Sequence, residues 1–135
     1  MTLSAQEALI HLMVIAASSD AKVSDRELEI ISRLVSRLPV FEGFERDQLG
    51  QIAAEAIDLI KDSSNLDKVL AMVLGAIPER LHDTAYALAV EVATVDLRLE
   101  QEELRFLEMI RDGLNLDTLI AAAIEASARA RLRHA

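Results

Sequence analysis

Apolar residues recur three and four positions apart along almost the whole chain, and no stretch alternates apolar with polar residues as a half-buried strand does. The pattern therefore predicts helices as the only regular structure. Seven are expected, over residues 4–18, 24–38, 45–61, 66–77, 78–95 and 100–112, with the last starting near Asn115 and continuing through Ile124. We expect an all-α fold, a compact seven-helix bundle.

Several of these helices carry their own start and stop signals. Ser4 with Glu7, and Ser24 with Glu27, have the spacing of a capping box, in which each side chain satisfies a free amide of the first turn. Gly113 is predicted to end the sixth helix, because glycine is common just past a helix C-terminus. Residues 9–15 of the first helix are apolar around most of its circumference, apart from His11, which indicates a central, buried helix.

The chain contains an internal repeat with a period of 76 residues. The repeat relates residues 5–38 to residues 81–114, so we expect two similar helix pairs within one domain spanning residues 1–135. The aligned pairs are Ala17 and Ala93, Asp20 and Asp96, Lys22 and Arg98, Val23 and Leu99, Glu27 and Glu103, Leu28 and Leu104, Ile31 and Leu107, Leu34 and Ile110, and Leu38 and Leu114.

Each copy of the repeat bends at an acidic turn, where an Asp precedes the Glu of the next helix. Asp20 and Glu27 in the first copy, and Asp96 and Glu103 in the second, offer oxygen ligands of the kind that hard divalent cations prefer. Two other interpretations stay open. Glu27 has the spacing of a capping residue, and nearby basic residues such as Lys22 would also neutralise the carboxylates.

The two turns resemble the twin motifs of tellurite-resistance TerB-like proteins. The motifs are residues 16–27 (AASSDAKVSDRE) and residues 93–103 (ATVDLRLEQEE), and the GLNL at residues 113–116 is also similar to the family. The resemblance covers nearly the whole chain. It implies a compact α-helical fold, a link to tellurite and chemical-stress resistance, no enzymatic activity, and metal ligation by Asp20, Glu27, Asp96 and Glu103.

This sequence departs from the family at one position of each motif. Where relatives have Gly after the Asp, it has Ala21 and Leu97, for which a left-handed backbone costs more. A Ca²⁺ loop of the EF-hand type does not fit, because Glu27 follows Asp20 by seven positions. If a cation binds, Ca²⁺ or Mg²⁺ is favoured over Zn²⁺.

Composition narrows the remaining function classes. A formal charge of −9 disfavours nucleic acid, and the apolar runs are too short to span a membrane. The absence of cysteine fits a reducing compartment, so we expect a cytoplasmic protein. The sequence contains no glycine-rich phosphate loop, nucleophile elbow or two-histidine helix motif, so we expect no catalysis.

Two functional hypotheses follow from the sequence. The first is a TerB-like stress-resistance protein that binds a divalent cation at the acidic turns and acts through protein partners. The alternative is a helical protein–protein interaction module without a metal function. The oligomeric state is open, with a homodimer as one option. The arginines 129, 131 and 133 are interpreted as compensation of a helix dipole in a solvated tail.

Overall fold

The computed structural model describes residues 2–18, 23–61, 63–94 and 101–135. Within these ranges the chain is helical and contains no strand, which confirms the all-α prediction. The α-helices are α1 (Ala5–Ala17), α2 (Asp25–Arg37), α3 (Leu49–Ile60), α4 (Leu66–Gly75), α5 (His82–Ala93), α6 (Gln101–Leu114) and α7 (Thr118–Arg131). Short 3-10 helices occupy Pro39–Phe41 (η1), Arg46–Gln48 (η2), Ser63–Asn65 (η3) and Glu79–Leu81 (η4). In the described ranges, no helix is both long and apolar enough to cross a membrane.

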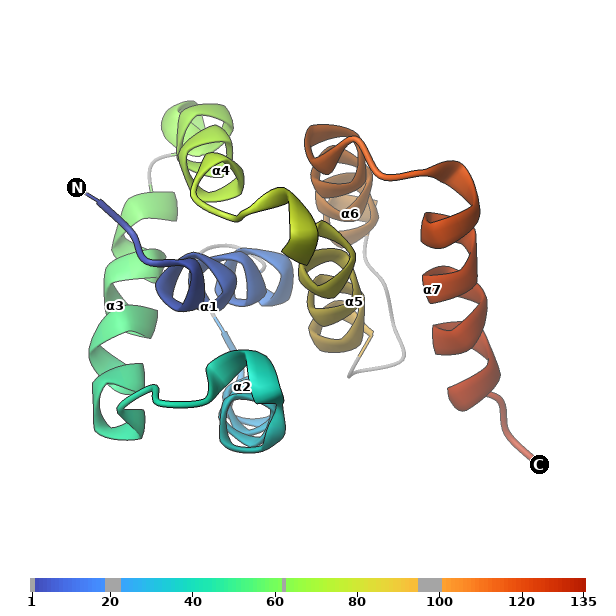
Figure 1. Ribbon diagram of the computed structural model, residues 1–135, viewed down its shortest axis with the longest axis horizontal. Coiled ribbons are helices and arrows are strands. Elements are labelled where there is room, and N and C mark those ends of the chain that lie inside the picture. Colours follow the sequence, from blue (N-terminus) through green and yellow to red (C-terminus); the bar gives the residue numbers. More distant parts are fainter. Residues whose placement is uncertain (1, 19–22, 62, 95–100) are drawn as a thin grey trace.

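Helix α1 forms the centre of the molecule. Every residue from Ala8 to Ala17 is buried, and α1 contacts α3, α4, α5 and α6 as well as α2. Figure 1 shows α3 and α5 on opposite sides of α1, with α7 at the far edge beyond α5. This arrangement explains why the first helix is apolar all round: it has no face left for solvent.

The 76-residue repeat is visible in the helix boundaries. Helix α5 begins 77 residues after α1 and ends 76 after it, and α6 begins 76 residues after α2. The two first helices, α1 and α5, make the largest helix–helix contact in the described part of the chain. Each of these two helices also packs against the third helix of its own half: α1 contacts α3, and α5 contacts α7.

Gln6 and His82, which the repeat aligns, make similar contacts in the two halves. Gln6 of α1 donates to the carbonyls of Val40 and Glu42, just beyond the end of α2, at 3.1 and 3.0 Å. Its counterpart His82 lies 3.1 Å from the carbonyl of Leu114, the last residue of α6. The first helix of each half is thereby tied to the end of the second.

The end of α6 differs from the sequence prediction. Gly113 does not terminate this helix, which continues to Leu114, and the left-handed residue is Asn115 with φ 51°. A Cβ at position 113 would overlap Cδ1 of Leu74. Gly113 thus lets α6 pack closely on α4, and asparagine, which tolerates the left-handed region better than most residues, ends the helix.

Three predicted helix starts were also too early. Residues 46–48 and 79–81 are 3-10 turns ahead of α3 and α5, and α7 begins at Thr118 rather than near Asn115. The connection from α6 to α7 is therefore very short. In the first half, by contrast, residues 38–48 separate α2 from α3 and bury Phe41 in the core.

Candidate functional site

The structure describes only part of the predicted acidic site. Asp20 and Asp96 lie outside the described residues, and so does Lys22, the basic residue that would compete with a cation. Glu103 is the third residue of α6, but its side chain is also outside the description. Glu27, the third residue of α2, is fully described. Glu27 and Glu103 therefore hold the same position in equivalent helices.

The Glu27 carboxylate caps its own helix. Its Oε1 accepts the backbone N–H of Ser24 at 2.9 Å, while the Ser24 hydroxyl accepts the N–H of Glu27 at 3.1 Å. Glu27 is only 7% exposed, whereas Ser24 is exposed, so the reciprocal pair lies at the edge of the buried region. The capping box predicted from the sequence is confirmed here, and likewise at Ser4 and Glu7.

No completed metal centre is present in the ranges that the structure describes. No three residues among their Asp, Glu and His side chains come together as a group that could hold an ion. The side chains of three of the four proposed ligands, Asp20, Asp96 and Glu103, are not described, so the proposed set is not tested by this finding.

A second polar cluster joins α5, α6 and α7. The buried Tyr86 donates its hydroxyl to Glu125 at 2.6 Å, and Arg111 lies 3.5 Å from the same carboxylate oxygen. Burial, and then the contact with Glu125, raise the pKa of Tyr86 well above its ordinary value of 10. The tyrosine is therefore a permanent donor at physiological pH.

Cavities flank this cluster on both sides, along the line where α6 and α7 diverge. The cavity of about 480 Å³ lies at the α6–α7 connection and is bordered by Asp112, Asn115 and Thr118. The cavity of about 330 Å³ is more apolar, and its wall includes Val90, Leu107 and Leu132. Both include Arg111 and Glu125, which form a bridge between them.

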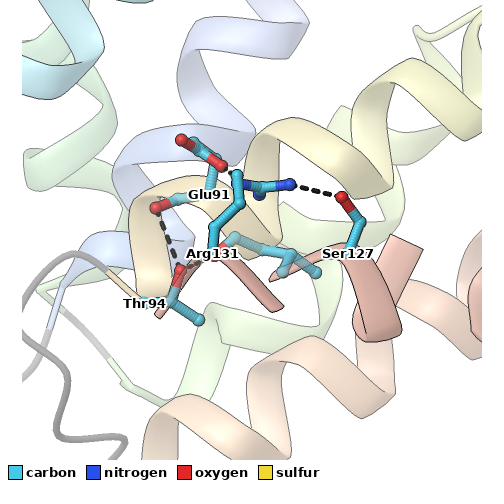
Figure 2. A network of polar contacts seen from close by, with 5 residues as sticks. Glu91, Thr94, Ser127 and Arg131 are labelled. Atoms are coloured by element: carbon cyan, nitrogen blue, oxygen red, sulfur yellow. Dashed lines mark hydrogen bonds and ion pairs between the residues drawn. The ribbon is translucent and has the colours of Figure 1, made fainter. Parts of the chain in front are cut away.

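The connection between α7 and α5 includes a polar network, shown in Figure 2. The Arg131 guanidinium pairs with Glu91 of α5 at 2.6 Å and also donates to Ser127 of α7. Thr94, at the end of α5, bonds back to the carbonyl of Val90 at 2.7 Å. Arg131 lies in the last turn of α7 with 51% of its side chain exposed, in keeping with the sequence interpretation, and the ion pair with Glu91 adds a contact to α5 that the sequence did not predict.

Replacing Tyr86 with Phe tests the cluster. The variant removes the donor but keeps the ring, and leaves a half-buried carboxylate with only Arg111. We expect the free energy of unfolding to fall by about 1–2 kcal/mol, measured by urea denaturation. Arg33→Gln, which removes an exposed ion pair with Glu29, is the control and should change stability by less than about 0.5 kcal/mol. A loss no larger than that of the control would contradict the proposed role.

Sequence reasoning did not find the Tyr86, Arg111 and Glu125 cluster. The available signal was Glu125, a carboxylate on the inner face of α7, four residues after Ala121 and three before Ala128, both buried. An acidic residue on a buried stripe needs a partner, and the partners come from two other helices. Only the three-dimensional arrangement identifies them.

One further buried polar residue has no hydrogen-bond partner. His11 is 0% exposed, and neither ring nitrogen makes a hydrogen bond within the described structure. Burial lowers its pKa below the ordinary 6.5, against the opposing effect of Glu55 on α3 and Glu7 on α1. The histidine is thus held neutral in the core, as its place in an apolar helix predicted.

The chain was compared with models of protein families, with curated proteins and with solved structures, and none of them matches it.

Proposed function

We propose that this chain is a non-catalytic, cytoplasmic, TerB-like protein of tellurite or chemical-stress resistance. It binds a divalent cation through its two acidic turns and acts through protein partners. The observation that carries the proposal is the repeat: α1–α2 and α5–α6 are equivalent helix pairs, and in the sequence the motif that resembles the family joins the two helices of each pair.

The chemistry of the ligands supports a hard cation. Asp20, Glu27, Asp96 and Glu103 would supply carboxylate oxygens, which suit Ca²⁺ or Mg²⁺ better than Zn²⁺. Capping does not exclude ligation by Glu27, because the hydrogen bond from Ser24 uses Oε1 only. The second oxygen makes no hydrogen bond among the described residues and would be the ligand atom.

Calorimetric titration with Ca²⁺, Mg²⁺, Mn²⁺ and Zn²⁺ tests the proposal. Wild-type protein should give saturable heat with Ca²⁺ or Mg²⁺, and at a hundredfold excess over Kd the free energy of unfolding should rise by about 2.7 kcal/mol. The double variant Glu27→Gln, Glu103→Gln should weaken binding by at least about tenfold, because glutamine preserves the capping box but lowers the ligand charge.

A matched control is Glu29→Gln with Glu108→Gln, which makes the same change in net charge on the exposed faces of α2 and α6. This control should bind the cation like the wild type. If the wild type shows neither saturable heat nor stabilisation with any of the four cations, the metal proposal fails. If cation binding is weakened equally in both double variants, the binding is non-specific attraction to negative charge and the proposed site fails.

The second candidate is a helical interaction module in which the turns serve only to start helices. It is favoured by the capping box of Glu27, which already accounts for this carboxylate. If no cation binds in the titration, this second candidate is the one that stands.

A further inference from the structure

The apolar cavity between α6 and α7 opens onto a face that we call the α6–α7 face. It is formed by Leu104, Glu108 and Arg111 of α6 together with Ala128, Arg129 and Leu132 at the end of α7. Tyr86 and Val90 of α5 line the cavity from the third side, and its volume is about 330 Å³. A space of this size accepts a leucine side chain from another molecule.

The same face carries an exposed leucine of its own. Leu104 borders the cavity and is 41% exposed, whereas Leu107, one turn further along α6, is 7% exposed. The large apolar side chains that are exposed in the described ranges are Leu28, Leu104, Leu119 and Ile120, three of them on α6 or α7. The α6–α7 face therefore presents a protruding leucine directly beside a cavity.

Its charges are complementary to each other across the cavity. Glu108 on the α6 side and Arg129 on the α7 side are both exposed, and neither forms an ion pair within the described structure. The other two charged groups of the cavity wall, Arg111 and Glu125, are paired with one another. One free acid and one free base thus remain at the rim.

A two-fold symmetric contact matches this combination. In such a contact, if residue i of one copy meets residue j of the other, then j also meets i. Two copies joined face to face would place Arg129 against Glu108 of the partner twice, and each Leu104 beside the cavity of the other copy. We propose that the α6–α7 face binds the same face of a second copy of this chain, forming a symmetric dimer.

The dimer is expected to be weak. The face takes in only the end of α7, at Ala128, Arg129 and Leu132, so the contact between two copies is small. The formal charge of −9 on each copy adds long-range repulsion. We expect association over the range of tens to hundreds of micromolar, about what a small transient interface gives.

Exchanging the charges of Arg129 and Glu108 tests the proposed dimer. Sedimentation equilibrium from 10 µM to 1 mM should show a wild-type monomer–dimer equilibrium. Arg129→Glu and Glu108→Arg should each weaken dimerisation by at least about tenfold, because each places like charges against each other twice. The double variant Arg129→Glu, Glu108→Arg should restore association to within about threefold of the wild type.

Arg37→Glu on the exposed face of α2 is the control, because it changes the net charge as Arg129→Glu does but lies outside this face. It should dimerise like the wild type, and circular dichroism should show all variants folded. A wild type that stays monomeric at 1 mM, or a double variant that does not recover, would overturn the proposal. This outcome is independent of the cation titration, which concerns the acidic turns.

Discussion

Replacing Leu12 with Ala should lower the free energy of unfolding by about 2–5 kcal/mol, the range for a large buried aliphatic residue truncated to Ala. Leu12 is 0% exposed on α1, and its neighbours come from several helices that cannot collapse onto the vacated space together. Urea denaturation followed by circular dichroism measures the change.

The matched control is Leu119→Ala on α7, where the same atoms are removed from a side chain that is 78% exposed. Its effect should stay below about 0.5 kcal/mol. Similar losses at the two positions would show that α1 is not the packed centre of the fold.

Acidification below pH 6.5 should destabilise the protein through His11. The unfolded chain takes up this proton near the ordinary pKa of 6.5, whereas the folded chain resists it because burial lowers the pKa. The unfolded state then binds more protons, so stability falls as the pH falls, by up to about 1.4 kcal/mol per pH unit between the unfolded and folded pKa values. Above that window His11 contributes no pH dependence.

The His11→Leu variant isolates this contribution. It removes two buried nitrogens that have no hydrogen bond, so at pH 7 it should be at least as stable as the wild type. The difference in stability between variant and wild type should grow as the pH is lowered from 7 to 5. His134→Gln in the exposed C-terminal residues is the control, and a wild-type pH profile that His11→Leu reproduces would contradict the assignment.

Helix content, the capping boxes and the central place of the first helix could be predicted from sequence, because each depends on residues close together in the chain. The period of 76 residues was equally accessible, since both halves bury the same positions of their second helix. Ile31 and Leu107, for example, are 0% and 7% exposed.

What the sequence could not provide depends on contacts between distant segments. Gly113 was interpreted from its local chemistry as a stop signal, but its use is set by Leu74 of another helix. Arg131 was interpreted as dipole compensation in the last turn of its helix, and its additional partner, Glu91 of α5, was not predicted. The cluster of Tyr86, Arg111 and Glu125 was missed for the same reason, and the acidic turns remain a prediction.

The burial of α1 has a consequence for synthesis on the ribosome. Residues 5–17 are translated before α5, yet their largest helix contact in the described part of the chain is with that helix, at residues 82–93. Until then only α2, α3 and α4 are available to cover this apolar helix. The apolar surface of α1 is therefore incompletely covered until the second half of the chain is made, and such transiently exposed surface favours aggregation.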